Sequence, residues 1–160
     1  MLSSIKTARL QALAVVLCLS ACGEGGVMSE ARVAAANKAA VLRLFDEVFN
    51  GGRDHVLREL VADEFVNINT GIAGPEGMAS GAAFLRKTFE APRFVVEDAM
   101  AEGDRVAVRW KLFGRHVGAF RGTPPSGDAV VMPAMSMFRM VDGKIAESWV
   151  QSGPPQARGS

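Results

Sequence analysis

The 160-residue sequence has no tyrosine, two histidines and two cysteines. The lack of tyrosine excludes a phenolic hydroxyl as the donor to an oxyanion. Cys18 lies in an apolar segment that we expect to be removed, so Cys22 is left alone and no intrachain disulfide can form. Metal sites need clustered Cys, His or carboxylate ligands, and His55 and His116 are far apart. We therefore expect no metal ion and no other cofactor.

An excess of charge of one sign is also missing. The chain carries 18 basic and 17 acidic residues, a formal net charge of +1. Proteins that bind nucleic acid usually present a strongly basic surface, so we do not expect DNA or RNA as a partner. The length corresponds to a single domain.

The N-terminus has the pattern of a secretory leader. Lys6 and Arg9 precede an apolar run from Leu10 to Leu19, which is too short to span a bilayer, since a spanning helix needs about 20 residues. Leu19-Ser20-Ala21-Cys22 resembles the lipobox of bacterial lipoproteins. That resemblance implies cleavage before Cys22 and lipidation of its thiol, which anchors the chain to a membrane. An ordinary cleaved leader is the alternative.

On the lipoprotein reading, residues 1–21 are the signal peptide and residues 22–28 are the lipidated cysteine with a flexible, glycine-rich tether. Gly23, rather than aspartate, follows Cys22. In bacterial lipoproteins this implies the outer membrane, so we expect a location in the cell envelope, facing the periplasm.

Hydrophobic periodicity predicts helices first and strands later. Ser29 is an expected N-cap, and Gly51-Gly52 ends the first helix. Thr70 to Gly77 reads as a loop that forms the rim of a pocket. The predicted helices cover residues 29–50, 54–61 and 75–89, the predicted extended segments cover 65–69, 93–101, 105–117, 129–141 and 144–152, and residues 153–160 are expected to be a disordered tail.

The segment 105–117 is the longest alternating run of the chain. Trp110 and His116 fall on its apolar face, which we expect to look into a core or a pocket. Asp142-Gly143 is a strong hairpin signal. Without a bulge, the hairpin pairs Phe138 with Glu147 and Ser136 with Trp149, and paired residues share a face. This register turns Glu147 and Trp149 toward the same side as Phe138.

Helices followed by antiparallel strands predict an α+β fold with helices on one face of a curved sheet. Four motifs stand out in the second half of the chain: Glu102-Gly-Asp-Arg-Val-Ala-Val-Arg-Trp, Gly114-Arg-His-Val-Gly, Gly122-Thr-Pro-Pro-Ser-Gly and Phe138-Arg-Met-Val-Asp-Gly-Lys-Ile-Ala-Glu-Ser-Trp. They resemble the SnoaL-like polyketide cyclases (ester cyclases) of the nuclear transport factor 2-like superfamily. The resemblance implies a cone-shaped, curved antiparallel sheet (an α+β barrel, as in cystatin-like folds) packed on about three helices around an apolar cavity. We assign this cone domain to residues 29–152.

The same resemblance assigns functional positions. Polyketide cyclases of this family close a ring by an aldol step, in which a carboxylate at the end of the last strand acts as acid and base. The family's asparagine helper matches Asn67, and its pocket-side histidine matches His116. The strand histidine, however, is replaced by Ser136, and the essential aspartate falls on Val150 or Gln151. Neither of these side chains can take a proton from carbon, so whether the chain is an enzyme is left open.

His116 and Glu147 are the candidate catalytic residues, as general base and general acid. The alternatives are a hydrogen-bonded core histidine, and a glutamate that a bulge turns toward solvent or toward an ion pair with Arg139 or Lys144. The predicted ligand pocket consists of Asn67, Trp110, Ser136, Phe138 and Trp149.

Two hypotheses about function follow from these residues. In the first, a membrane-anchored periplasmic cavity protein binds a small apolar or aromatic molecule, with or without cyclase- or isomerase-type activity. In the second, a non-catalytic module forms a homodimer through its sheet and serves an envelope complex.

Overall fold

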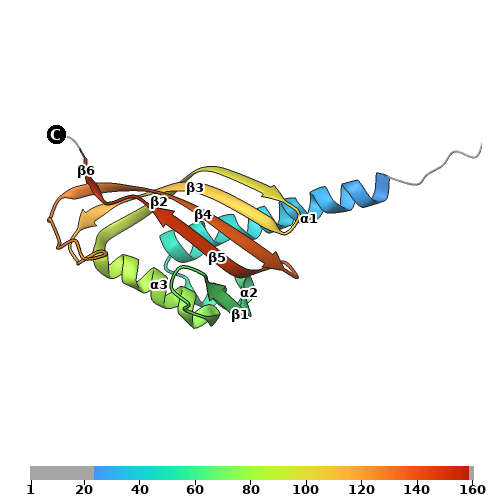
Figure 1. Ribbon diagram of the computed structural model, residues 1–160, viewed down its shortest axis with the longest axis horizontal. Coiled ribbons are helices and arrows are strands. Elements are labelled where there is room, and N and C mark those ends of the chain that lie inside the picture. Colours follow the sequence, from blue (N-terminus) through green and yellow to red (C-terminus); the bar gives the residue numbers. More distant parts are fainter. Residues whose placement is uncertain (1–23, 159–160) are drawn as a thin grey trace, which may run out of the picture.

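A computed structural model describes residues 24–158. The predicted signal peptide and Cys22 lie outside this range. Within it, a curved sheet of six strands covers α1 and α3, as Figure 1 shows. No helix of the described part of the chain is long and apolar enough to cross a membrane.

The first helix starts earlier than predicted. α1 runs over Glu24–Arg43 and continues as a π-helical turn, η1, over Leu44–Asn50. Ser29 therefore lies inside the helix rather than at its N-cap, and residues 24–28 are helical rather than a flexible tether. The end agrees with the sequence, because Gly52 has φ 65, a left-handed conformation that glycine adopts without strain.

The segment between η1 and the main sheet begins with η2, Asp54–Val56, and α2, Leu57–Leu60. β1, Val61–Asn67, follows, and α3 spans Gly74–Thr88 with a proline in its first turn. The helix ends at Thr88, within one residue of the predicted end. Pro92 lies in β2, where the register shifts between Glu90 and Arg93.

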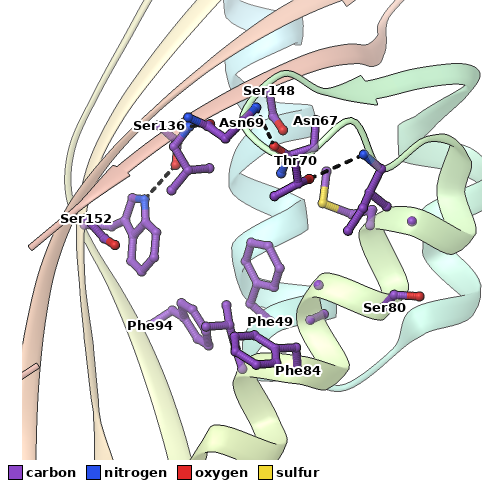
Figure 2. A pocket seen from close by; sticks show the side chains of 18 of the residues that line it. Phe49, Asn67, Asn69, Thr70, Ser80, Phe84, Phe94, Ser136, Ser148 and Ser152 are labelled. Carbon is purple, nitrogen blue, oxygen red and sulfur yellow. Dashed lines mark hydrogen bonds between the residues drawn. The ribbon is translucent and has the colours of Figure 1, made fainter. Parts of the chain in front are cut away.

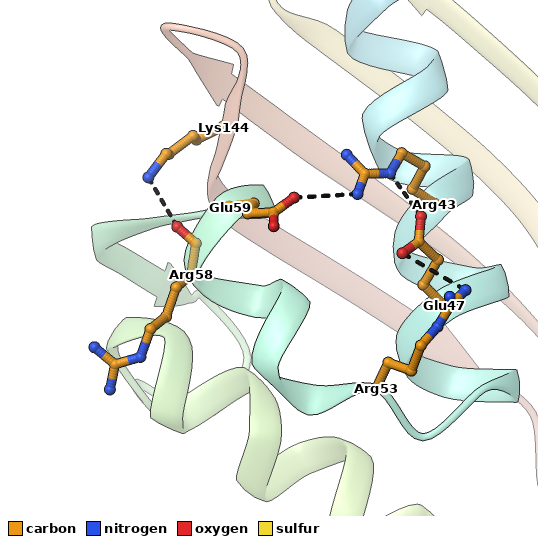
Figure 3. Close-up of polar contacts among 6 residues, drawn as sticks. All are labelled: Arg43, Glu47, Arg53, Arg58, Glu59 and Lys144. Carbon is orange, nitrogen blue, oxygen red and sulfur yellow. Dashed lines mark hydrogen bonds and ion pairs between the residues drawn. The ribbon is translucent and has the colours of Figure 1, made fainter.

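Ion pairs and a hydrogen bond join these helices to the sheet (Figure 3). Arg43 Nε lies 2.6 Å from Glu47 Oε1, and its Nη2 lies 3.2 Å from Glu59 Oε2 on α2. The Arg43 guanidinium lowers the pKa of Glu47 by hydrogen bonding to its carboxylate. Lys144 Nζ donates to the Arg58 carbonyl oxygen over 2.9 Å. The contacts hold α2 between η1 and β5.

The strands are β2 Phe89–Glu102, β3 Arg105–His116, β4 Ala129–Val141 and β5 Lys144–Ser152. The order across the sheet is β1-β5-β4-β3-β2. β2 to β5 pair antiparallel, as predicted, but β1 pairs with β5 in parallel. The sheet is therefore mixed rather than purely antiparallel. β3 alternates as predicted, with Val106, Val108, Trp110, Leu112 and His116 all buried.

The hairpin between β4 and β5 contains a bulge, which is the alternative named above for Glu147. Val141 pairs with Lys144 and Met140 with Ile145, but Arg139 then pairs with Glu147 and Ala146 is skipped. One extra residue moves every later side chain of the strand to the other face. The predicted pairs of Phe138 with Glu147 and Ser136 with Trp149 are therefore wrong.

The C-terminal segment was expected to be a disordered tail. Instead β6, Gln156–Ala157, pairs antiparallel with β4 opposite Val130 and Val131. The Arg158 N–H extends this pairing by donating to the Ala129 carbonyl over 2.9 Å. Backbone hydrogen bonds therefore order this segment up to Arg158.

Candidate functional site

A cavity of about 500 Å³ lies between α3 and the concave face of the sheet. This volume falls in the range of about 300–1,000 Å³ that is typical of small-molecule sites. Its wall is mainly apolar, and Asn67, Asn69, Thr70 and Ser148 lie together at one end (Figure 2). Residues from η1, β1, α3 and all four long strands contribute to the lining.

One end of the cavity is aromatic. Phe49 of the π-helical turn stacks on Phe94 of β2 with ring centres 5.0 Å apart, and Phe94 lies 5.5 Å from Trp110 of β3. Near the mouth, Phe84 of α3 stacks on Phe120 at 6.2 Å. Such rings favour a flat apolar or aromatic ligand, which can stack on them or meet their edges.

The opposite end of the cavity is polar but uncharged, with the side chains of Asn67, Asn69, Thr70 and Ser148 (Figure 2). The Asn69 N–H donates to Asn67 Oδ1 over 3.0 Å, and the Val150 N–H donates to Asn69 Oδ1 over 2.7 Å. These hydrogen bonds fix the two amides in place. A neutral carbonyl or hydroxyl is the ligand group that such amides and hydroxyls bind.

Four of the predicted pocket residues line this cavity: Asn67, Trp110, Ser136 and Phe138. The Trp110 indole N–H donates to Ser136 Oγ over 2.9 Å, and both residues are buried. Thr70, Ile72 and Gly77 also contribute to the lining, so the glycine-rich loop forms part of the rim as predicted.

Trp149 does not line the cavity, and its predicted placement is wrong. Because of the bulge it pairs with Met137, which pairs with Ala107, which in turn pairs with Met100. This cross-strand row lies on the outer face of the sheet, where Met100 is 65% and Met137 is 45% exposed. The Arg105 guanidinium carbon lies 5.6 Å from the centre of the Trp149 ring.

Glu147 does not line the cavity either, so its assignment as a catalytic residue is wrong, and the alternative of a bulge and an ion pair with Arg139 is confirmed. Arg139 Nη2 donates to Glu147 Oε1 over 2.5 Å, and this hydrogen bond lowers the pKa of the glutamate. A general acid needs a raised pKa to hold its proton near neutral pH. The ion pair therefore gives Glu147 the opposite of the property that the catalytic hypothesis required.

His116 is buried on the inner face of β3, as the alternation predicted, but it lies outside the cavity. Its ring stacks on Phe89 with centres 5.5 Å apart, and Phe89 packs at 5.6 Å against Phe120, which lines the cavity. Its Nε2 atom finds no hydrogen-bond partner among the described residues. A ligand in the cavity meets Phe120 rather than the imidazole.

Among the described residues that line the cavity there is no Asp, Glu or His, and Arg121 is the one charged side chain. A search of residues 24–158 also finds no group of three His, Cys, Asp or Glu residues able to hold a metal ion. The lining can bind and orient a ligand through apolar contacts and hydrogen bonds. It offers no carboxylate or imidazole for moving a proton.

Comparison with known proteins assigns this chain to a family. The model of the SnoaL-like polyketide cyclases matches residues 39–153. The chain belongs to this family. Its fold is accordingly the SnoaL-like, nuclear transport factor 2-like α+β fold, and the family suggests a cyclase-type protein that binds a small molecule.

Proteins similar to this chain come from several bacteria. Aklanonic acid methyl ester cyclase AcmA of Streptomyces galilaeus is 32% identical over 111 residues, which cover 66% of this chain and 77% of that protein. A solved SnoaL-like polyketide cyclase structure from Jannaschia sp. CCS1 is 34% identical, with a TM-score of 0.67 and coverage of 75% of this chain and 87% of that one. TsrD from Streptomyces laurentii is 25% identical, with a TM-score of 0.67 and coverage of 74% and 88%.

Within this SnoaL-like chain, Ser136 and Val150 stand where the resemblance puts the family's strand histidine and essential aspartate. The structure places both on the cavity wall. Gln151, the other candidate for the aspartate position, is exposed and pairs with Met135 on the outer face. The position that reaches the cavity therefore carries an apolar side chain.

Several site residues were missed by reasoning from the sequence of this family member. Phe49 lies in a π-helical turn, which local periodicity does not reveal. Asn69 and Arg121 lie in loops, and the positive charge of Arg121 in a turn-rich segment was the one available signal.

Proposed function

We propose that this protein binds a small, flat, apolar or aromatic molecule in the cavity and does not catalyse ring closure. The observation that carries the proposal is the lining itself: an aromatic end, a neutral polar end, and no proton-transfer group among the described lining residues. Burial of a planar ring against Phe49, Phe94 and Trp110 supplies the affinity, because apolar area leaves water. Asn67 and its neighbours orient the ligand.

The two tryptophans allow a direct binding test. Trp110 lines the cavity and Trp149 lies on the outer face, and the chain has no tyrosine to interfere. In the Trp149→Phe variant, the Trp110 emission should change on titration with a naphthalene or anthraquinone probe. In the Trp110→Phe variant, the Trp149 emission should not change. A response from Trp149 alone contradicts binding in the cavity.

A second measurement separates binding from catalysis. Some relatives are named as cyclases of aklanonic acid methyl ester, so we choose this compound as the test substrate. We expect the protein to bind it without closing the ring. Turnover by the wild type would contradict the proposal. Turnover that survives Ser136→Ala and His116→Ala would also require a catalytic group that the cavity wall does not provide.

The proposal includes attachment to the bacterial envelope. It is supported by Lys6, Arg9 and the segment Leu19-Ser20-Ala21-Cys22, and it puts the domain in the periplasm at the outer membrane. The intact mass of protein from the membrane fraction should show Cys22 as the lipidated first residue. Cys22→Ser should release the chain from the membrane. An unmodified cysteine, or cleavage elsewhere, rules out the lipoprotein assignment.

The outer face of the sheet supports the second hypothesis, a homodimer. Met100, Ala107, Met137 and Trp149 form a cross-strand row, and Met135 beside it is 56% exposed. Exposed apolar side chains gathered on one face favour association. We expect a dimer in light scattering, and Met135→Glu with Met137→Glu should convert it to a monomer that still binds ligand. A wild-type monomer would exclude the dimer and leave the cavity proposal intact.

A further inference from the structure

The single charged side chain in the cavity lining sits on an unusual turn. The Phe120 N–H donates to the Thr123 carbonyl over 2.9 Å, and the Thr123 N–H donates to the Phe120 carbonyl over 2.9 Å. Between them, Arg121 has φ 47 and Gly122 has φ 81. Turns with positive φ at both central residues favour Gly, Asn and Asp. A long side chain in the first position is strained, and strain of this kind is typical of functional positions.

The Arg121 guanidinium is available to a ligand. It forms no ion pair with any described carboxylate, whereas Arg139 pairs with Glu147 and Arg86 pairs with Asp54. Its Cζ atom lies 5.3 Å from the centre of the Phe120 ring, so the aromatic face holds the group without using its N–H donors. A planar guanidinium matches a carboxylate, which it can bind through two parallel hydrogen bonds.

The cavity has a different polar group at each end. Arg121 follows Phe120, which stacks on Phe84, and Figure 2 shows Phe84 at the end away from Asn67 and Ser148. A ligand that spans the cavity would therefore meet a cation at one end and neutral hydroxyls and amides at the other. None of the described lining residues is acidic, so the lining has no negative charge that would repel an anion.

We propose that the ligand is a planar aromatic carboxylate whose carboxylate binds Arg121. Its ring packs against the aromatic end formed by Phe94 and Trp110, and a hydroxyl or carbonyl at its far end faces Asn67. This assignment rests on the proposed binding function and narrows the ligand class from flat apolar or aromatic molecules in general to those that carry a carboxylate. It also gives a reason for the strained backbone, since the turn presents the guanidinium at the cavity.

Calorimetry with a matched pair of probes tests the assignment. 6-Hydroxy-2-naphthoate carries a carboxylate and a hydroxyl at opposite ends, and its methyl ester lacks only the charge. At low ionic strength the wild type should bind the acid about fivefold more tightly than the ester, as an exposed ion pair allows. This preference should fade in high salt, which screens exposed charges. Arg121→Gln should weaken the binding of the acid but not of the ester, so that both probes bind equally.

Arg93→Gln is the matched control. The Arg93 guanidinium carbon lies 5.1 Å from the centre of the Phe113 ring, so it resembles Arg121 in charge and setting but lies outside the cavity. It should keep the preference for the acid. Arg121→Asn is a second variant whose side chain suits positive φ, and it should behave as Arg121→Gln does.

The outcomes separate this inference from the binding function. If the wild type binds acid and ester equally, or if Arg93→Gln also loses the preference, the assignment to Arg121 is wrong while ligand binding stands. If neither probe binds and the Trp110 emission does not change with a naphthalene or anthraquinone probe, the proposed binding function is wrong, and this inference is wrong with it. A preference for the acid that is lost only in the Arg121 variants supports the proposal.

Discussion

Arg139 and Glu147 face each other directly across β4 and β5, and Arg139 Nη2 donates to Glu147 Oε1 over 2.5 Å. The bulge at Ala146 creates this pair, because without it Glu147 would lie beside Phe138. One inserted residue thus converts a candidate catalytic carboxylate into half of an ion pair. The inner face of the hairpin is left with Ser136, Phe138, Ser148 and Val150.

Replacement of Glu147 should affect stability but not ligand binding. Arg139 lowers the pKa of Glu147 in the folded protein, so the pair stabilises the fold above the ordinary glutamate pKa of about 4.3 and this contribution is lost as the pH falls through the lower folded value. The difference in Tm between wild type and Glu147→Gln should be present at about pH 7 and shrink below about pH 4. Thermal unfolding by circular dichroism measures it.

Glu64→Gln serves as the control, because Glu64 is exposed and forms no ion pair in the described structure. Its Tm difference from wild type should be small at both pH values. A Glu147→Gln difference that grows on acidification would contradict the ion pair.

Gly81 offers a way to fill the cavity from α3. It lines the cavity, and a Cβ at this position would meet nothing within 4 Å. Gly81→Ala should stabilise the protein by about 0.5–1 kcal/mol, the usual helix penalty of glycine relative to alanine, and keep binding. Gly81→Phe should weaken probe binding by at least about tenfold, or roughly 1.4 kcal/mol. Ala83→Phe, on the exposed side of the helix, should leave binding unchanged, and equal losses would contradict the location of the site.

Ser136 should matter for stability through its bond to Trp110. Ser136→Ala removes the acceptor of a buried indole N–H, and an unsatisfied buried donor costs about 1–3 kcal/mol. Ser152 also lines the cavity, but its buried hydroxyl has no partner within the described structure, so Ser152→Ala should be close to neutral. Urea denaturation measures both variants. Equal destabilisation would show that the Trp110 bond contributes little.

A carboxylate restored at Val150 should restore chemistry. Val150→Asp puts an acid on the apolar wall, where burial raises its pKa and suits it to proton transfer. We expect the variant to convert aklanonic acid methyl ester at a rate at least about tenfold above the wild-type background. Chromatography of the product measures this rate. Gln151→Asp adds the same charge on the outer face and should have no effect. Activity in both variants, or in neither, argues against Val150 as the lost catalytic position.

Arg121 should reduce the stability of the fold. Its φ of 47 lies in the left-handed region, which costs most residues about 1–2 kcal/mol and asparagine less. Arg121→Asn should therefore stabilise the protein by roughly 0.5–1 kcal/mol in urea denaturation while removing the preference for an aromatic carboxylate. Arg93→Asn, in β2, should not stabilise it. A destabilised Arg121→Asn would show that the side chain contributes packing instead.

The sequence predicted the elements of this fold well where the signal is local. The alternation of β3 identified Trp110 as a cavity residue, and Asp142-Gly143, with φ 49 and 77, forms the expected turn. The predicted register is wrong beyond the bulge in β5. At the bulge, the sequence neighbours Ile145 and Ala146 are both buried. Neither residue type indicates a bulge, so the sequence left both registers open, and the register without a bulge assigned Glu147 and Trp149 to the wrong face.

His116 shows a second limit of the same kind. Alternation placed it correctly on the inner face, but Phe89 and Phe120, from before and after it in the chain, come between it and the cavity. Arg121 shows the reverse case, since a residue in a turn of unremarkable composition became part of the cavity lining.

The sequence by itself determined the α+β class, most element boundaries, the family and the apolar face of the central strand. Those features depend on the spacing of residues along one segment, where the period of a helix or strand acts directly. Tertiary structure alone decided which residues of that face reach the cavity, that Glu147 pairs with Arg139, and that Arg121 is the charged residue among the described residues of the lining. These outcomes depend on register and packing between distant segments, and a single inserted residue in one strand changes them.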